Sequence, residues 1–324
     1  MSVTRTPKKT NSEVSKILKE MTVKVKDADC SVGSDVLHTD FWPSGNSAID
    51  YVIGGGLPMG KIVEVFGPES SGKTTLLMCW IAEIQSRGGI CALVDIERAL
   101  SPNYAMKLGV DLSNLLLSEP DNGESAFEAI RFLVRTNKVK LIGVDSVAGL
   151  VPKYELDGKV GDKHIALQAR LVGQGLRMLV ADIKKAGCCV VFLNQLRDKI
   201  GVMFGSPTDT PGGRALKFWA SVRLDIRRRK ILEDKLKKVL GNTSEVINKK
   251  NKVGYPFKKA TVDIFYSSGI SQYSGLLELA ERLEVVQKVK GRTYSFNGEE
   301  FTKGSFETEV AGNPEFIKRV FFDG

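Results

Sequence analysis

A glycine-containing segment between a strand pattern and a helix pattern constrains this chain more than any other feature. Residues 62–66 before it are β-branched and alternating, and Leu77, Trp80, Ile81 and Ile84 after it recur at helical spacing. The segment fits the phosphate-binding pattern G-x-x-x-x-G-K-[ST] and consists of Gly67, Pro68, Glu69, Ser70, Ser71, Gly72, Lys73, Thr74 and Thr75. Glycines let backbone N–H groups approach phosphate oxygens, and the helix adds the positive end of its dipole. The sequence therefore predicts binding of a nucleoside triphosphate, with Lys73 at the β- and γ-phosphates and the Thr74 hydroxyl on Mg²⁺.

Strand and helix patterns alternate along the chain that follows. Apolar strands are predicted at residues 90–94, 139–144 and 188–193, and amphipathic helices at residues 124–137 and 167–185. Continuous apolar strands that alternate with helices indicate an α/β fold with a mostly parallel sheet covered on both faces. A further strand is predicted at residues 260–266.

Polar side chains follow three of the predicted strands. Glu97, Asp145 and Gln195 each stand at a strand's carboxyl end, where parallel sheets bind their ligands. Asp145 follows an apolar run, which is typical of the acid that orients Mg²⁺. Glu97 is interpreted as the carboxylate that activates the attacking water, and an ion pair with Arg98 at the surface is the alternative.

The charge balance favours a polyanionic partner. The 324 residues include 47 Lys and Arg against 38 Asp and Glu, a net charge of +9, and many of these cations lie between Arg227 and Lys252. A solvated charged face remains the alternative for the part of this segment from Lys235 to Lys238. No apolar run approaches the ~18 residues that span a bilayer, so we expect no membrane partner. Five cysteines without a Cys-x-x-Cys pattern favour reduced thiols and a cytoplasmic location.

Two loops after strand ends combine basic and apolar residues. The first covers residues 157–164, and the second covers residues 196–213 and carries Arg197, Lys199, Ile200, Met203, Phe204, Gly212 and Gly213. Such a mixture suits single-stranded nucleic acid, because cations follow the phosphates and apolar groups contact the bases. Arg170 and Arg177, two helical turns apart, are expected to point the same way. A lid over the nucleotide is the alternative.

The two ends of the chain differ from its centre. Residues 1–35 are charged and contain one predicted helix with the apolar stripe Val14, Ile17, Leu18 and Met21, which packs on its own core or on a neighbouring subunit. Residues 36–270 are expected to form the core. Residues 271–324 are expected to form a small α+β domain, with a helix at residues 276–283 and a hairpin turn at Asn297-Gly298.

Four segments together carry a resemblance to a known family. They are the phosphate-binding segment and residues 194–197, 199–205 and 215–228. With these, the chain resembles the bacterial RecA recombinases from about residue 41 to 313. The resemblance implies a RecA-like P-loop core and a DNA-dependent ATPase that uses ATP and Mg²⁺. It implies polymerisation on single-stranded DNA as a head-to-tail helical filament, with double-stranded DNA as the pairing partner in strand exchange.

The resemblance also implies a role for individual residues. Lys73, Glu97 and Gln195 are similar to the catalytic residues, with Gln195 sensing the γ-phosphate, and Thr74 and Asp145 are similar to the Mg²⁺ ligands. Tyr104 resembles the aromatic that stacks on adenine. Lys250 and Lys252 resemble lysines that reach the ATP of the adjacent subunit, and Phe218 resembles an interface residue. The amino-terminal helix becomes the arm that docks on a neighbour. The DNA contacts are then Arg170, Arg177, Arg197, Lys199, Ile200, Met203, Phe204, Gly212 and Gly213.

Several positions depart from the family pattern. Ser101 replaces an acid near the adenine, Arg98 replaces a histidine, and Arg214 replaces an asparagine. The carboxyl end lacks the acidic tail that is common in the family, which would suit a bacteriophage-encoded member. Two rival functions are a hexameric helicase or translocase on the same fold and an ATP-binding regulator that joins filaments without hydrolysis.

Overall fold

The computed structural model describes residues 12–25, 39–159, 166–198 and 208–323. The chain divides into two compact units, residues 1–40 and 41–324. Of the first unit, the structure describes helix α1 (Ser12–Lys24), whose Val14, Ile17 and Met21 are exposed. The predicted amino-terminal helix is therefore present, with its apolar stripe unburied by the described part of its own unit.

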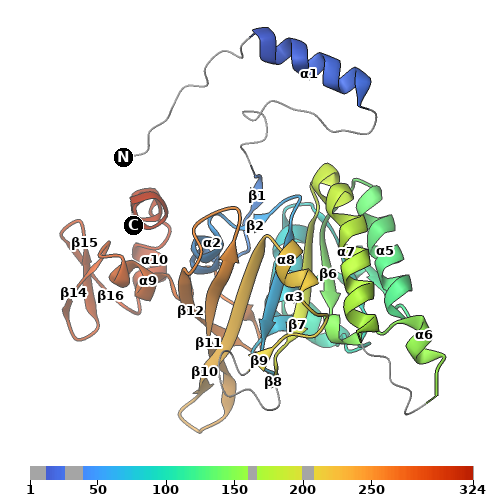
Figure 1. Ribbon diagram of the computed structural model, residues 1–324. Coiled ribbons are helices and arrows are strands. Elements are labelled where there is room, and N and C mark those ends of the chain that lie inside the picture. Colours follow the sequence, from blue (N-terminus) through green and yellow to red (C-terminus); the bar gives the residue numbers. More distant parts are fainter. Residues whose placement is uncertain (1–11, 26–38, 160–165, 199–207, 324) are drawn as a thin grey trace. The chain divides into compact units, whose positions relative to one another are not determined.

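A nine-stranded sheet organises the second unit (Figure 1). One half of it is parallel and has the strand order β3-β7-β6-β4-β5. This half confirms the predicted α/β class with a mostly parallel sheet. Its strands are β3 (Ile62–Gly67), β7 (Cys189–Gln195), β6 (Val139–Asp145), β4 (Ile90–Asp95) and β5 (Leu115–Ser118).

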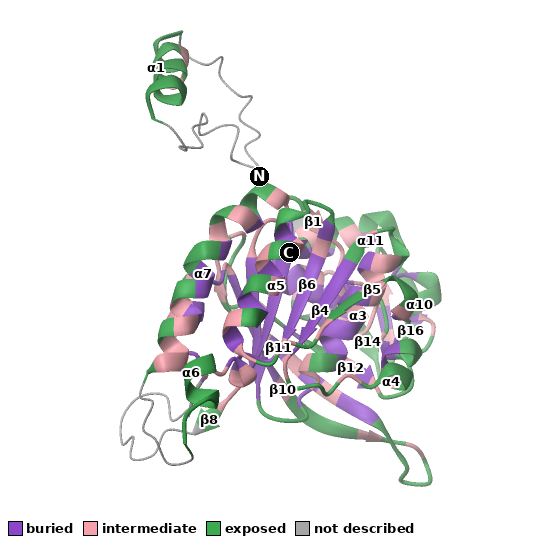
Figure 2. Cartoon of the chain, turned by 90° about the vertical axis from the view of Figure 1, so that its right-hand side faces the viewer, coloured by how far each residue is buried: buried purple, intermediate pink, exposed green. Residues whose placement is uncertain are grey.

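Helices cover both faces of the parallel half. Helix α3 (Lys73–Ser86) packs on one face, where Val63, Val65 and the fully buried Trp80 belong to one apolar cluster. Helices α5 (Gly123–Arg135), α7 (Leu167–Ala186) and α8 (Ala215–Trp219) supply the cluster on the other face. Figures 1 and 2 show α5 and α7 side by side, and Figure 2 shows the buried strands behind them. Because both faces are covered, the strands are continuous apolar runs, and this made them predictable.

The other half of the sheet is antiparallel. It consists of β10 (Val222–Glu233), β11 (Val239–Asn251), β12 (Lys259–Phe265) and β13 (Gly269–Ile270), and β10 joins it to β3. The segment between Arg227 and Lys252 is therefore a strand pair, which the sequence prediction missed. Charged side chains hid the strand period, and some of them form cross-strand pairs, such as Arg229 with Glu245 and Lys249 with Asp225. Beyond Asp225 the ribbon of β10 and β11 extends past β3 (Figure 1).

The carboxyl-terminal region shares the main apolar core. The predicted hairpin at Asn297-Gly298 is confirmed, since both residues have positive φ and β15 pairs with β16. Phe296, Phe306 and Phe316 pack together in the cluster that also holds α3. The elements are α9 (Leu276–Arg282), β14 (Gln287–Lys290), β15 (Thr293–Phe296), β16 (Glu299–Thr302), α10 (Phe306–Glu309), α11 (Pro314–Lys318) and η4 (Arg319–Asp323).

Short elements complete the fold. They are β1 (Phe41–Trp42), α2 (Ser47–Ile53), β2 (Leu57–Pro58), α4 (Pro102–Lys107), η2 (Leu112–Asn114), η3 (Val147–Gly149), α6 (Lys153–Leu156), β8 (Arg197–Asp198) and β9 (Thr208–Asp209). Within the described residues, no helix combines the length and the apolar character needed to cross a bilayer.

Candidate nucleotide-binding and DNA-binding site

The phosphate-binding segment begins at Gly67, the last residue of β3, and ends in the first turn of α3, which starts at Lys73. A Cβ at Gly67 would lie 2.1 Å from the carbonyl oxygen of Ile226, and one at Gly72 would lie 2.5 Å from Cδ1 of Ile264. Gly72 also has φ of +99°, a conformation that glycine adopts at little cost. The two glycines therefore allow the loop to pass close to β10 and β12 and to turn into the helix.

The Lys73 side chain folds back over the start of the phosphate-binding segment. Its Nζ donates to the carbonyl oxygens of Gly67 at 3.1 Å and of Pro68 at 2.7 Å. Burial lowers the pKa of Lys73, while the carboxylates of Asp145, Glu69 and Glu97 act in the opposite direction. The ammonium group thus stands among carboxylates, at a place where phosphate oxygens would add hydrogen-bond acceptors.

Thr74 and Asp145 meet from two elements. The Thr74 hydroxyl donates to Oδ2 of Asp145 at 2.9 Å. Burial, with a contribution from the carboxylates of Glu97 and Asp95, raises the pKa of Asp145 to about 6, although the hydrogen bond from Thr74 acts in the opposite direction. A hydroxyl beside a carboxylate fits Mg²⁺, which takes few protein ligands and keeps water and phosphate oxygens around it. The described residues contain no group of three or more His, Cys, Asp or Glu for an all-protein metal site.

Glu97 lies beside Asp145 because β4 and β6 end together. Asp95 and Asp145 are paired in register, and the Glu97 amide donates to the Asp145 carbonyl oxygen at 3.4 Å. The Glu97 carboxylate accepts a hydrogen bond from the Ser146 hydroxyl. Arg98 forms its ion pair with Asp121, so the alternative of a Glu97–Arg98 surface pair is wrong.

Gln195 lies next to the start of the phosphate-binding loop. It is paired in register with Gly67, and the Leu196 amide donates to the Gly67 carbonyl oxygen at 3.2 Å. The chain then enters the second predicted DNA loop, where β8 pairs with β9. Gln195 thus connects the nucleotide side to this loop through one short stretch of backbone.

Tyr104 reaches the same region from α4. Its hydroxyl lies 2.8 Å from Oγ1 of Thr75, and burial raises its pKa. The predicted residues of the nucleotide site in this chain, from the loop to Glu97, Tyr104, Asp145 and Gln195, therefore lie together at the carboxyl edge of the parallel half.

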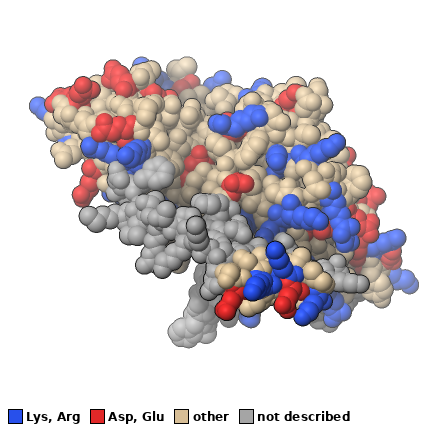
Figure 3. All heavy atoms as spheres, turned by 90° about the horizontal axis from the view of Figure 1, so that it is seen from above, with Lys and Arg blue, Asp and Glu red and all other residues tan. Residues whose placement is uncertain are grey.

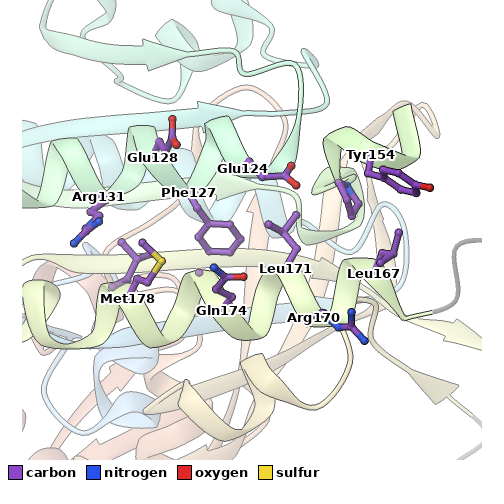
Figure 4. Close-up of a pocket in the computed structure, with 13 residues that line it drawn as sticks. Glu124, Phe127, Glu128, Arg131, Tyr154, Leu167, Arg170, Leu171, Gln174 and Met178 are labelled. Atoms are coloured by element: carbon purple, nitrogen blue, oxygen red, sulfur yellow. The ribbon is translucent and has the colours of Figure 1, made fainter. Parts of the chain in front are cut away.

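The predicted DNA-binding residues are only partly brought together. Arg197, Gly212 and Gly213 line one cavity of about 440 Å³. Arg170 lines a different groove of about 360 Å³ between α5 and α7, whose floor includes Phe127 and Leu171 (Figure 4). Arg177 is exposed on α7. Lys199, Ile200, Met203, Phe204 and residues 160–165 of the first loop lie outside the described residues.

Lys250, Lys252 and Phe218 lie together, away from the phosphate-binding loop. Nζ of Lys250 donates to the carbonyl oxygens of Lys217 at 2.7 Å and Phe218 at 2.8 Å, and Nζ of Lys252 lies 5.5 Å from the centre of the Phe218 ring. The Phe218 side chain is 65% exposed. Burial, with a contribution from the cations of Lys252 and Arg223, lowers the pKa of Lys250 to about 8.

The edge on which these lysines lie follows from the strand register. The Lys252 amide donates to the Ser221 carbonyl oxygen, and the Ser221 amide donates to that of Ile62, the first residue of β3. The phosphate-binding loop begins at the other end of β3, about 16 Å away at ~3.3 Å per residue. Lys and Arg side chains form patches on the face seen from above the view of Figure 1 (Figure 3).

Sequence reasoning assigned no role to a buried polar group between these two regions. Glu64 and Asn194 are fully buried, and Arg223 donates to the Glu64 carboxylate. A glutamate inside an apolar strand pattern was the signal that could have drawn attention to it, because charges are rarely buried without a partner.

A phosphate-binding loop, an acid at a neighbouring strand end and a carboxylate beside it define a P-loop nucleoside triphosphatase. The family described as RecA N-terminal domain matches residues 13–271. Proteins named "Protein RecA" are similar over most of their length. The one from Cutibacterium acnes is 49% identical over 281 residues, 86% of this chain and 80% of the relative. The one from Rippkaea orientalis is 52% identical over 261 residues, 81% of this chain and 74% of the relative.

The chain therefore belongs to the RecA family. It is a DNA-dependent ATPase and a recombinase of DNA recombination and repair.

Proposed function

We propose that this protein polymerises on single-stranded DNA with ATP between neighbouring subunits and exchanges strands with a homologous duplex. The observation that carries the proposal is the separation of its phosphate-binding groups. The loop stands at the carboxyl end of β3, while Lys250 and Lys252 stand near its amino end. A single subunit cannot bring both to one nucleotide, whereas a head-to-tail neighbour can.

Within such an interface, each group has a chemical task. Lys73 and the neighbour's Lys250 and Lys252 stabilise the charge on the transferring phosphoryl group. Glu97 orients the attacking water, and its bond to Ser146 holds the carboxylate in place. Thr74 and Asp145 would hold Mg²⁺, which neutralises charge between the β- and γ-phosphates when it is bound. Tyr104 offers a ring for the adenine.

The DNA site is proposed at the second loop. The cavity lined by Arg197, Gly212 and Gly213 lies next to the carboxyl end of β7, where Gln195 is the last residue. Phosphates would contact Arg197, and Arg170 and Arg177 would extend the contact along α7. Because Gln195 is next to Gly67, the presence of a γ-phosphate can change the loop that follows it.

A mixing experiment tests the subunit arrangement. Lys250→Ala should lose DNA-dependent ATP turnover because its neighbour's site lacks a cation. Glu97→Gln should bind ATP through its intact loop but fail to hydrolyse it. Mixing the two inactive variants should restore turnover, since Lys250→Ala sites then receive the lysine from Glu97→Gln subunits. Failure to restore any turnover would contradict ATP binding between subunits.

A second experiment tests the DNA site. Arg197→Ala should weaken binding to single-stranded DNA and reduce the slope of log affinity against log salt by about one phosphate contact. Arg135→Ala is the matched control, because Arg135 pairs with Asp182 on the outer helices. An unchanged slope for Arg197→Ala would favour a nucleotide lid.

The assembly and its location complete the proposal. Head-to-tail contacts build either open filaments or closed rings, and electron microscopy with DNA and ATP separates the recombinase from a ring helicase. Measurable ATP turnover separates it from a regulator that only binds ATP. The free thiols of Cys79, Cys91, Cys188 and Cys189 support a cytoplasmic location.

A further inference from the structure

A buried polar group crosses three adjacent strands, β7, β3 and β10. The Glu64 carboxylate on β3 accepts from Nδ2 of Asn194 on β7 at 3.0 Å and from Nε of Arg223 on β10. Glu64 and Asn194 are fully buried, and the Arg223 side chain is 15% exposed. The Arg223 guanidinium also stacks over the Phe66 ring, 4.5 Å from its centre. A buried ion pair of this kind contributes little net stability, so its retention calls for another explanation.

One end of this group touches the second DNA loop. Nδ2 of Asn194 also donates to the carbonyl oxygen of Pro211 at 3.2 Å, immediately before Gly212 and Gly213. Oδ1 of Asn194 accepts from the amide of Gln195 at 3.0 Å. Asn194 therefore contacts both the residue at the nucleotide and the returning end of the loop.

The other end of the group lies beside the interface lysines. Arg223 is paired in register with Lys250 across β10 and β11. Among the charged neighbours that shift the pKa of Lys250, Lys252 and Arg223 are cations and Glu64 is an anion. The Lys250 ammonium is held by carbonyl oxygens of α8, the helix that begins two residues after Gly213. Removing the charge of Glu64 would leave these cations to repel one another at close range.

We propose that Glu64 is a positioning residue: it joins the returning end of the DNA loop to Arg223 and thereby sets where Lys250 stands for the neighbouring subunit's ATP. The inference rests on the proposed function, because it assumes that Lys250 acts between subunits. Glu64 would then influence hydrolysis at the neighbour's nucleotide rather than at the nucleotide bound to its own loop.

Glu64→Gln is the informative substitution. The glutamine has nearly the same shape, and its oxygen can still accept from Asn194. It has no charge, and its Nε2 is a donor that would replace the oxygen that accepts from Arg223. DNA-dependent turnover should fall roughly tenfold, chiefly in kcat, because Lys250 stabilises charge that develops in the transition state. Glu245→Gln is the matched control, since it removes a half-buried carboxylate from the same sheet half, where it pairs with Arg229 and Lys259. Its turnover should stay within about twofold of the native protein, because the ion pairs of Glu245 among the described residues involve neither Pro211 nor Lys250.

Mixed filaments decide in which direction Glu64 acts. Glu64→Gln is mixed with Glu97→Gln, which supplies a native Glu64 and Lys250 but no hydrolysis of its own. At equimolar mixing, roughly half of the Glu64→Gln sites receive a native neighbour, so turnover per Glu64→Gln subunit should rise several-fold. Action on the subunit's own nucleotide, or a purely structural role, predicts no rise.

The Lys250→Ala mixture serves as the reference for this result. If Lys250→Ala is rescued by Glu97→Gln and Glu64→Gln is not, the inference is overturned and the proposed function stands. If neither is rescued, the arrangement between subunits itself fails. Should Glu64→Gln not unfold cooperatively, Arg223→Lys takes its place in the same mixtures with the same outcomes. Lysine keeps the charge but loses the planar group that lies over Phe66 and donates to Glu64.

Discussion

The two halves of the central sheet are joined where β3 pairs with β10, but they differ in burial and in the placement of their charged side chains. The parallel half is covered by helices on both faces and carries most of its polar side chains where its strands end, with the buried Glu64 inside β3 as the exception. The antiparallel half carries charges along its length, from Arg223 to Lys250, and some of these are paired across strands. The parallel half thus collects the residues of the proposed nucleotide site at one edge, and the antiparallel half places Lys250 and Lys252 near the opposite edge.

This difference shows how a subunit can fold fully on its own and still carry only part of the proposed ATP site at each edge of its sheet. The key lysine of each half has hydrogen-bond acceptors within its own subunit. Lys73 donates to the carbonyl oxygen of Gly67 in its loop, and Lys250 donates to that of Lys217 in α8. The chemistry proposed above requires one half from each of two copies. Three predictions test this division, and they are ordered by the size of the expected effect.

The largest effect is expected in the parallel half. Lys73→Ala removes the cation nearest the phosphates, so ATP turnover should fall by about 10²–10³-fold or more, the scale seen when one donor to a developing charge is lost. Lys138→Ala is the control, because this exposed lysine lies before β6, at the far end of the strand from the site. Steady-state turnover with single-stranded DNA measures both, and normal turnover by Lys73→Ala would contradict the site.

An intermediate effect is expected beneath the antiparallel half, and it depends on pH. Burial raises the pKa of Asp50 in α2 to about 6, and α2 packs against β11 and β12. A raised carboxyl pKa lowers the free energy of unfolding as pH rises from about 4 to 6, because the unfolded chain ionises first. Asp50→Asn should therefore have little effect near pH 4 and stabilise the protein by about 1–3 kcal/mol above pH 6.

Chemical denaturation at pH 4, 5, 6, 7 and 8 measures this difference. Asparagine keeps an acceptor for the Ser44 amide, which donates to Oδ1 of Asp50 at 2.9 Å. The exposed Glu128 on α5 gives the control Glu128→Gln, with an expected change below about 0.5 kcal/mol. A gain for Asp50→Asn that is as large at pH 4 as at pH 8 would exclude burial of the carboxylate as its cause.

The smallest effect is expected at the tip of the ribbon. Leu236 is 89% exposed between β10 and β11, where neither strand pairs with a further strand of the described part of the chain. Leu236→Ser should change the free energy of unfolding by less than about 0.5 kcal/mol. Leu224→Ala, at a fully buried position of β10, should cost about 2–5 kcal/mol and provides the contrast. Equal costs for the two substitutions would mean that the ribbon tip is packed.

The sequence predicted the parallel half well for a physical reason. Strands that are buried on both faces must be apolar, and the glycines, Lys73 and Thr74 form a pattern that the phosphate requires at fixed spacing. The strand ends then follow, which is why Glu97, Asp145 and Gln195 could be placed together before the structure was known.

The antiparallel half escaped prediction because its pattern depends on partners distant in the chain. Arg229 is compatible with a strand because Glu245 lies opposite, and Arg223 is compatible with burial because Glu64 lies on the neighbouring strand. Neither partner can be identified from local periodicity. Local sequence also cannot show which cavity a surface arginine lines. The sequence analysis grouped Arg170 and Arg197 by charge, whereas the structure places them at two different cavities.

The position of Lys250 and Lys252 at the far end of β3 from Gly67 also determines how a row of such subunits would terminate. One terminal subunit would present a nucleotide pocket with no lysines to close it, and the opposite terminal subunit would present lysines with no nucleotide to meet. The two tips of the polymer would therefore be chemically unlike. Growth at one tip would depend on the nucleotide already held there, and growth at the other would depend on the nucleotide carried by the arriving subunit, which gives the polymer an intrinsic direction.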